Sequence, residues 1–269
     1  MNTSCLYWII PLSAAISTVL YLYLHKKTHI NLSYLYKDNI INIVLTCLII
    51  GYISIHFDTG FFFSLIFLIL CTIGICVVLT LIRFYRIPFR KVISDPNAIL
   101  SPADGNVIYI KQINSGVIPI AVKNGMEASL TEFAQTDLLN YPCWLIGINM
   151  TPFDVHKNSA PVDGRIILNK HIDGQFKSLK EPDALQCNER NSIIIDNPKG
   201  KIGVIQTASR LVRRIVTYKE EGEILAQGDW FGMIKFGSQV DIIIPANCIL
   251  NIQEKQQVYA KKTIIAKWE

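Results

Sequence analysis

Three clusters of the sequence hold the side chains best suited to acid–base or nucleophilic chemistry. A histidine exchanges a proton near neutral pH, and a serine hydroxyl becomes a nucleophile once a base removes its proton. Each cluster also has a structural interpretation. Asp104-Gly105 and Gly237-Ser238 are typical of hairpin turns, and His156 could be an ordinary buried or surface histidine. The clusters are SPADG at 101–105, MTPFDVHKNSAPVDG at 150–164 and FGMIKFGSQVD at 231–241.

Taken together and in order, these clusters resemble one family. The sequence is similar to the phosphatidylserine decarboxylases, in particular to their short, membrane-anchored bacterial and archaeal branch. The resemblance covers residues 83–269, and a hydrophobic hairpin before that region also fits the branch. The matching stretches are SPADG at 101–105, PFDVHKNSAPVDG at 152–164, NERN at 188–191, LVRRI at 211–215 and GDWFGMIKFGSQVDIIIP at 228–245.

This resemblance implies an enzyme that makes a pyruvoyl cofactor from its own serine. The Ser238 hydroxyl would attack the Gly237 carbonyl, where the absence of a Cβ leaves the approach open. The resulting ester would eliminate and leave a pyruvoyl group at position 238. The products are a β chain of 1–237 and an α chain of 238–269, which remain associated. Neither a metal nor pyridoxal phosphate is expected.

By the same resemblance, His156 is the base that activates Ser238, and Asp104 orients and charges its imidazole. The amine of phosphatidylserine would form a Schiff base with the pyruvoyl group and lose CO2. His156 would then return a proton, and phosphatidylethanolamine would be released. The chain is thus expected to be a carboxy-lyase of phospholipid biosynthesis. Ser159 stands where many relatives have a second histidine, which leaves the division of labour open, and Gln239 replaces their serine, threonine or arginine.

Other interpretations remain at this stage. The same chemistry could act on another amine, or the chain could be a membrane-anchored binding domain without activity. The polar group Asn188–Asn191 either orders the substrate or the cleavage loop, or forms a hydrogen-bonded turn between two strands. Seven scattered cysteines, without a CxxC pair or zinc spacing, indicate reduced thiols in the cytoplasm.

The composition predicts that part of the chain lies in lipid. Hydrophobic residues make up 51% and charged residues 17%, against about 25% charged in soluble domains. The uncharged runs 6–24, 40–57 and 61–82 approach the roughly 20 residues of a membrane span. A cleaved signal peptide is disfavoured for the first run because its basic residues follow it. Pro11 leaves open whether that run truly spans.

Basic residues follow the first and third runs, whereas Asp58-Thr59-Gly60, the turn predicted between the second and third, has none. The positive-inside rule therefore places residues 83–269 in the cytoplasm, beside the inner cell membrane. Residues 1–82 would be the membrane anchor. Arg83, Arg86, Arg90 and Lys91 would set this topology or attract anionic headgroups. A net charge of +5 is too small to indicate nucleic acid, and the oligomeric state stays open.

Residues 83–269 are expected to form a mostly β (α+β) domain, sandwich-like or barrel-like. Short β-branched runs alternate with turn residues, and no internal repeat is evident. One helix is expected over 127–139. The predicted strands are 107–113, 145–150, 165–168, 192–195, 202–206, 211–218, 232–236 and 240–244.

Overall fold

The computed structural model describes residues 6–28, 32–57, 60–93, 95–114, 117–118, 128–179, 181, 184–209, 214–235 and 238–269. The chain divides into two compact units. One consists of Met1–Arg86 with Thr151–Phe153, and the other of Ile87–Met150 with Asp154–Glu269.

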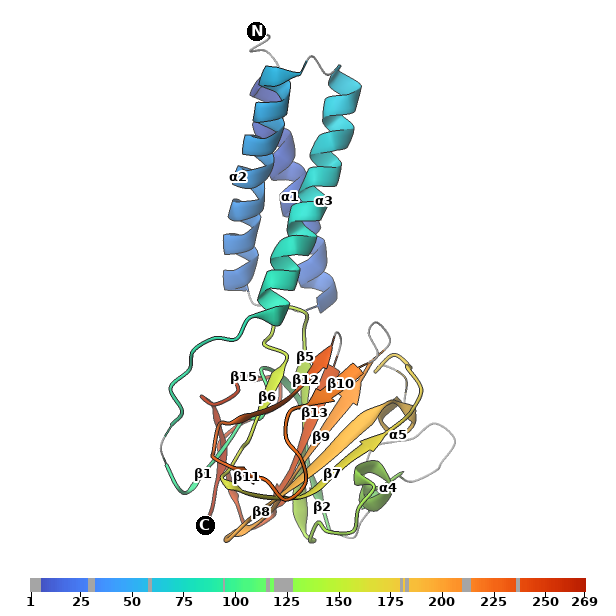
Figure 1. Ribbon diagram of the computed structural model, residues 1–269, viewed down its shortest axis with the longest axis vertical. Coiled ribbons are helices and arrows are strands. Elements are labelled where there is room, and N and C mark those ends of the chain that lie inside the picture. The colour runs from blue at the N-terminus through green and yellow to red at the C-terminus, as the bar shows by residue number, and fades with distance from the viewer. Residues whose placement is uncertain are drawn as a thin grey trace. The chain divides into compact units, whose positions relative to one another are not determined.

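The first unit contains three long helices, α1 (Leu6–Thr28), α2 (Leu32–His56) and α3 (Phe61–Tyr85) (Figure 1). Helices α1 and α3 each cover a predicted hydrophobic run and extend beyond it, whereas α2 begins before the run 40–57 and ends one residue short of its last residue. All three are long and apolar enough to cross a membrane, so the predicted N-terminal apolar helices are confirmed. Asp58 and Thr59 of the predicted turn lie outside the described residues.

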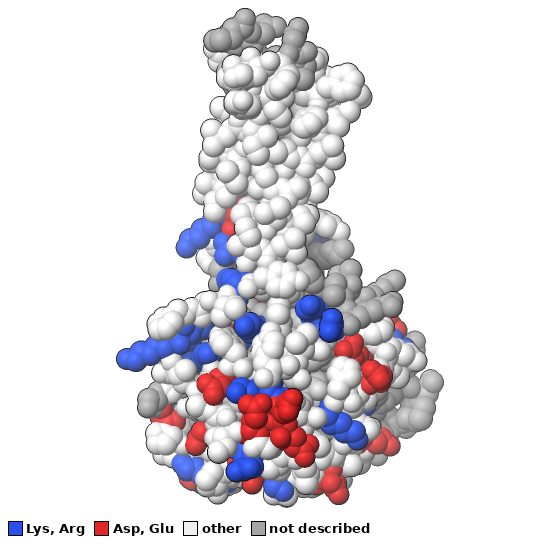
Figure 2. Space-filling view, in the orientation of Figure 1, with Lys and Arg blue, Asp and Glu red and all other residues white. Residues whose placement is uncertain are grey.

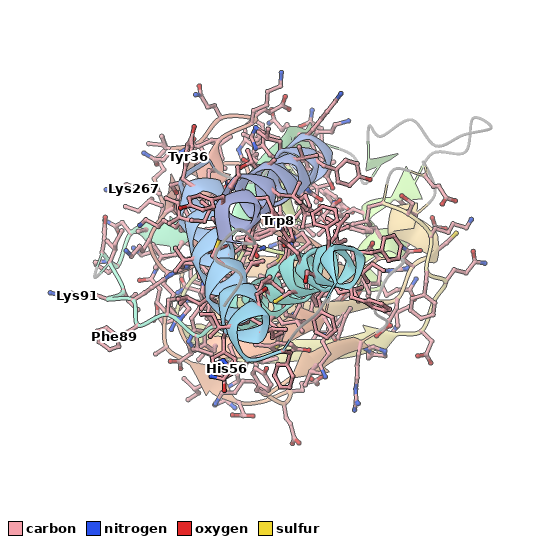
Figure 3. All side chains as sticks on the ribbon, turned by 90° about the horizontal axis from the view of Figure 1, so that it is seen from above. Trp8, Tyr36, His56, Phe89, Lys91 and Lys267 are labelled. Atoms are coloured by element: carbon pink, nitrogen blue, oxygen red, sulfur yellow. The ribbon has the colours of Figure 1, made fainter. Side chains whose placement is uncertain are left out.

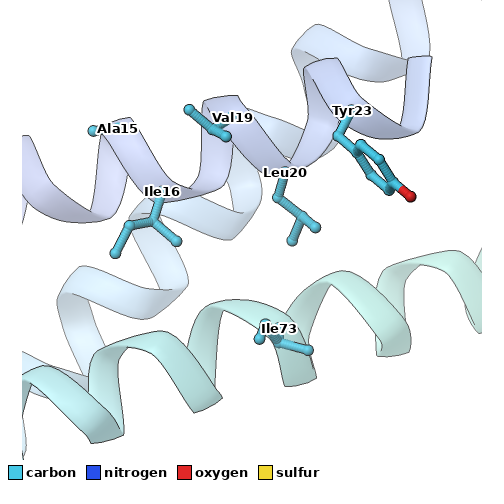
Figure 4. Close-up of a pocket in the computed structure, with 6 residues that line it drawn as sticks. All are labelled: Ala15, Ile16, Val19, Leu20, Tyr23 and Ile73. Carbon is cyan, nitrogen blue, oxygen red and sulfur yellow. The ribbon is translucent and has the colours of Figure 1, made fainter. Parts of the chain in front are cut away.

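Few charged side chains lie along these helices, and they gather at one end (Figure 2). There the Arg83 guanidinium pairs with the buried carboxylate of Asp38. Farther along the bundle, Asn42 Nδ2 donates to the Thr72 carbonyl at 3.0 Å, which satisfies a polar side chain among apolar neighbours. A shallow apolar groove of about 480 Å³ runs between α1 and α3 (Figure 4).

The second unit is built on one eight-stranded antiparallel sheet, which curls into a half-barrel (Figure 1). Its order is β11 (Ile224–Leu225), β7 (Gly164–Ile172), β8 (Arg190–Asn197), β9 (Gly200–Ala208), β13 (Ser238–Pro245), β5 (Cys143–Met150), β2 (Gly105–Ile113) and β15 (Gln257–Val258). The β-rich, barrel-like fold predicted from the sequence is therefore confirmed.

Smaller elements complete this unit. Two three-stranded sheets are formed by β10 (Arg214–Thr217), β12 (Trp230–Lys235) and β6 (Lys157–Ser159), and by β1 (Ala98–Leu100), β16 (Ile264–Lys267) and β14 (Ile249–Leu250). The remaining elements are the pair β3 (Val117–Ile118) and β4 (Ala128–Ser129) and the short helices α4 (Leu130–Ala134) and α5 (Ala184–Cys187).

Strand β13 shows how the sheet is buried on both faces. Val240 and Ile242 belong to the main apolar core, whereas Ile243 packs in a second core with residues of α4. Side chains alternate between the faces of a strand, so β13 contributes to both cores. This explains the nearly continuous apolar run of its sequence.

Strands β2 and β7 begin with the same Pro-x-Asp-Gly motif. Pro102-Ala103-Asp104-Gly105 opens β2, and Pro161-Val162-Asp163-Gly164 opens β7. A Cβ on either glycine would lie 2.4 Å from a carbonyl oxygen of the neighbouring strand, Asn149 in one case and Asp196 in the other. Each strand also has a register irregularity shortly afterwards, at 107–109 and 166–168.

Two further predictions need correction. The helix expected over 127–139 is only α4, Leu130–Ala134, because Gln135 adopts a left-handed conformation (φ 53°) and ends it. The strands β12 and β13, on either side of Gly237, do not form a hairpin. They belong to different sheets, because β12 pairs with β10 and β6 while β13 pairs with β5 and β9.

Candidate active site

Backbone hydrogen bonds join the sequence clusters that were singled out for chemistry. The Ser159 amide donates to the Pro102 carbonyl at 2.9 Å, which ties β6 to the turn that carries Asp104. The Ala160 amide donates to the Asp229 carbonyl at 2.8 Å, and the Gly228 amide donates back to the Ala160 carbonyl at 2.8 Å. Three segments far apart in the sequence therefore meet around β6.

His156 lies immediately before β6 and has no solvent-exposed surface. Its Nδ1 atom lies 2.9 Å from the Asp154 carbonyl oxygen. A carbonyl only accepts, so in this hydrogen bond Nδ1 carries the proton, and the lone pair of the neutral ring is on Nε2. This contact fixes the ring in the tautomer that a general base needs.

Asp104 is also buried, and its partners are not those expected from the sequence. Arg90 Nη2 donates to Oδ2 at 2.7 Å, and the amides of Ala260 and Val155 donate at 2.9 and 3.4 Å. Each described hydrogen bond of Asp104 is made with one of these three groups. Among these bonds, the one from the Val155 amide connects the carboxylate to the backbone next to His156. Sequence reasoning assigned Arg90 to topology or to headgroups and missed this buried ion pair.

The backbone of Ser238 begins β13 in the middle of the large sheet. It is opposite Met150 of β5 on one side and Ala208 of β9 on the other. Phe236 and Gly237, and with them one side of the predicted cleavage site, lie outside the described residues. The predicted scissile bond thus stands where the chain passes from one sheet to another.

The Asn188–Asn191 group braces the strand beside Ser238. Asn188 Nδ2 donates to the Ala208 carbonyl at 3.0 Å, and the Ala208 amide donates to the Glu189 carbonyl at 2.9 Å. Arg190 is buried, and its guanidinium donates to the carbonyls of Phe133, Asn188 and Glu132 at 3.0 to 3.3 Å. These contacts give the group a structural role, but it is not a turn, because Arg190 and Asn191 are the first residues of β8 and Asn188 forms a bridge with Gln175.

A pair of buried amides near these residues was not predicted. Gln206 Nε2 donates to Asn158 Oδ1 at 2.7 Å, and neither residue is exposed. Asn158 follows His156 by two residues, and Gln206 precedes Ala208, the residue opposite Ser238, by two. Within the described part of the chain, Asn158 Nδ2 and Gln206 Oε1 have no hydrogen-bond partner. Such atoms are costly to bury, so each calls for an explanation such as a water, an ion or a ligand that pairs with it.

Comparison with known proteins points to one family. The family model described as phosphatidylserine decarboxylase matches residues 78–266. A protein of Methanocaldococcus jannaschii, provisionally assigned as an archaetidylserine decarboxylase proenzyme, is 42% identical over 195 residues, which are 72% of this chain and 93% of that protein. A protein of Methanothermobacter thermautotrophicus with the same provisional assignment is 38% identical over 71% of this chain and 82% of its own length.

The chain belongs to the phosphatidylserine decarboxylase family. The predicted carboxy-lyase class is thereby supported. Gln239 is one of two positions, with Ser159, that the resemblance marks as a departure from many relatives. Its Nε2 atom donates to both oxygens of Asp241, at 2.9 and 3.0 Å, and to the Tyr109 hydroxyl oxygen at 2.8 Å.

This polar group lies on the second core face of β13. Asp241 has no exposed surface, and burial raises the pKa of its carboxyl to about 7, although hydrogen bonds from Tyr109 and Gln239 oppose the rise. Gln239 therefore has a defined structural role in this decarboxylase. In the described residues, no three His, Cys, Asp or Glu side chains gather as metal ligands would.

Proposed function

We propose that this protein is a pyruvoyl-dependent phosphatidylserine decarboxylase, which cuts its own chain between Gly237 and Ser238 and produces phosphatidylethanolamine. The observation that supports this most directly is the placement of His156. It is buried beside the joined clusters, with Nδ1 held by the Asp154 carbonyl and its lone pair on Nε2. An imidazole held in this way can remove a proton from the Ser238 hydroxyl without first changing tautomer.

The residues present suit a cofactor made from the chain itself. Ser238, its precursor, is the first residue of β13, and the ladder with β5 and β9 holds that residue from both sides. The pyruvoyl group would supply the electron-accepting carbonyl that decarboxylation of an amino acid headgroup requires. The chain's part is to position the headgroup, exclude water and move protons. His156 would carry out both proton transfers in this proposal. The division of labour stays open because Ser159 stands where many relatives have a second histidine.

Asp104 acts in this proposal as a positioning residue. It accepts from the Val155 amide at 3.4 Å, next to His156, and its charge is balanced by Arg90. The carboxylate therefore fixes the turn that carries the imidazole. A cationic partner and two backbone donors satisfy the hydrogen-bonding oxygens of this buried carboxylate and balance its charge.

The three apolar helices would hold the enzyme in the cell membrane, with residues 83–269 on the cytoplasmic side. The distribution of basic residues supports this orientation. A lipid substrate also gives a decarboxylase a reason to be anchored, whereas a soluble amine gives none.

A second substrate is favoured by the names of the relatives, which are assigned to archaetidylserine. Phosphatidylserine and archaetidylserine share the serine headgroup, on which the proposed chemistry takes place. The candidate substrates are separated by measuring CO2 release from vesicles of phosphatidylserine, from vesicles of archaetidylserine and from free serine in solution. Turnover of free serine alone would contradict a lipid decarboxylase.

The denatured mass of the purified protein tests self-processing. We expect two fragments that separate between Gly237 and Ser238, with the smaller one blocked at its N-terminus. Ser238→Ala should give one uncut, inactive chain, and His156→Ala should cut slowly or not at all. An uncut wild-type chain that releases CO2, or an active Ser238→Ala variant, would contradict the pyruvoyl assignment.

A further inference from the structure

The segment 87–93, which leads from α3 to the globular unit, has two faces of different chemistry. Its inner face packs on the globular unit. Arg90 holds Asp104 and also donates to the Ala260 carbonyl at 3.0 Å. Val92 packs against Gly228 so closely that a Cβ there would lie 2.6 Å from a valine methyl. The segment is therefore fixed in place by residues at alternate positions.

The outer face of the same segment is apolar and exposed. Phe89 is fully exposed at 100%, and Ile87 is exposed at 57%. Lys91 is exposed between Phe89 and Ile93, and Figure 3 shows Phe89 and Lys91 pointing outward from this segment. Removing the apolar surface of a phenylalanine from water is favourable. A fixed backbone that displays this side chain completely indicates a surface that is covered in the working protein.

We propose that the outer face, formed by Ile87, Phe89, Lys91 and Ile93, binds the interfacial layer of the lipid bilayer. The inference rests on the proposed membrane crossing of α3, which ends at Tyr85. Phe89 follows Tyr85 by only four residues, a distance of at most about 14 Å. The headgroup layer on each side of a bilayer is roughly 5–8 Å thick. The length of chain therefore keeps Phe89 close to this layer.

The composition of the outer face suits this environment. Aromatic and aliphatic side chains enter the boundary between headgroups and acyl chains, and a lysine beside them meets anionic phosphates. The short distance from α3 explains why this face would lie at the lipid surface, whereas a site for a protein partner would not need to be close to α3. The same short segment would then contact lipid with Phe89 and hold Asp104 with Arg90, so it would keep the candidate site beside the lipid surface that supplies its substrate.

The test uses the full-length protein in vesicles, with a new tryptophan as the reporter and Trp8→Phe as the background. Phe89→Trp is compared with two matched variants. Phe67→Trp reports on an exposed position inside α3, six residues from its start, and Ile224→Trp reports on an exposed apolar position of the globular unit, at 70% exposure. Fluorescence quenching is measured with lipids brominated either near the headgroup or near the chain ends. The signal of each variant is its difference from the background protein, which keeps the tryptophans of the globular unit.

We expect the reporter at position 89 to be quenched more strongly by the shallow bromines than by the deep ones. The reporter at position 67 should show the reverse, and the one at position 224 should stay unquenched. If position 67 is quenched and position 89 behaves like position 224, α3 crosses the membrane and the proposed lipid contact is wrong. If position 67 is not quenched either, the membrane crossing itself fails. Unquenched, blue-shifted emission from position 89 would show that protein covers this face, which also overturns the proposal.

A functional measurement complements this test. Phe89→Ser should leave self-cleavage unchanged and lower kcat/KM for phosphatidylserine in bilayers several-fold, while short-chain phosphatidylserine in solution is processed normally. If Phe89→Ser loses no activity relative to the wild type on either substrate, this face has no role at the membrane.

Discussion

Asp241 is a carboxyl group with no exposed surface, three residues after the proposed cleavage site. Burial raises its pKa to about 7 from 3.8. Between these values the native state holds a proton that the unfolded chain has lost, so stability must fall as the pH rises through this window. One proton gives a slope of at most about 1.4 kcal/mol per pH unit. The neighbouring Tyr109 donates its hydroxyl to this carboxyl, and its own pKa is raised further by burial.

The prediction is that Asp241→Asn removes this part of the pH dependence. The amide cannot ionise, and its oxygen can still accept from Tyr109. Denaturation midpoints of both proteins between pH 5 and pH 8 should diverge, with the variant gaining relative stability toward pH 8. Parallel curves would show that Asp241 does not titrate in this range.

The buried amides of Asn158 and Gln206 allow structure and activity to be separated. Gln206→Met removes one partner of a buried hydrogen bond and should cost about 1–3 kcal/mol of stability. The double variant Asn158→Leu, Gln206→Met removes both partners and should recover most of that loss. We expect its decarboxylase activity to stay low, because the pair lies beside the candidate site. Activity that recovers together with stability would show that the amides serve only the fold.

At the scale of elements, the start of β2 determines where Asp104 lies. Gly105 has φ 154°, and a Cβ on it would lie 2.4 Å from the Asn149 carbonyl oxygen, which is backbone and cannot move aside easily. Gly105→Ala should therefore destabilise the domain and slow self-cleavage. Gly222→Ala is the matched control, because Gly222 also has positive φ (92°) but has open space around it. If both variants lose the same stability, backbone strain and not the steric clash explains the effect.

Local patterns predicted most elements but not their partners. Each of the eight predicted strands overlaps an observed strand, because alternation and turn residues are properties of short segments. Residues 211–213 and 236 of these predictions lie outside the described residues. The hairpin at Gly237-Ser238 was wrong since pairing depends on strands distant in the sequence, and β13 lies between β5 and β9. The ion pair of Arg90 with Asp104 was missed for a related reason. Its arginine belongs to a linker without periodicity, where a basic residue after an apolar helix suggests topology alone.

The candidate site was predictable to a similar degree. His156, Asp104 and Ser238 were found by resemblance, and the structure joins their clusters through β6. The amides of Asn158 and Gln206 could not be found, because neither residue type stands out in the sequence and only the fold places them together. The glycine repeat at 102–105 and 161–164 was visible in the sequence and could have been used to align β2 with β7.

At the scale of the whole molecule, the proposed cleavage makes β13 the first strand of a separate α chain. This strand pairs over eight residues with β5 and over six with β9, both of which stay in the β chain. Its side chains also fill both cores, with Val240 and Ile242 on one face and Ile243 on the other. Losing the α chain would open the centre of the sheet, so the two chains should separate only when the domain unfolds.

The cut enzyme and the uncut Ser238→Ala chain should therefore differ in how their unfolding depends on protein concentration. In the cut enzyme, unfolding releases two chains, so its midpoint should rise with protein concentration. In Ser238→Ala the chain stays whole, so the midpoint should be independent of concentration and higher, since a covalent link keeps the strand at an effective concentration near the millimolar range. Thermal unfolding in detergent, measured over a hundred-fold dilution, checks both statements. Fragments that separate on gel filtration without denaturant would contradict the central role of β13. A midpoint that depends on concentration in Ser238→Ala as well would instead reveal an oligomer, because dissociation of subunits would then accompany unfolding of either form.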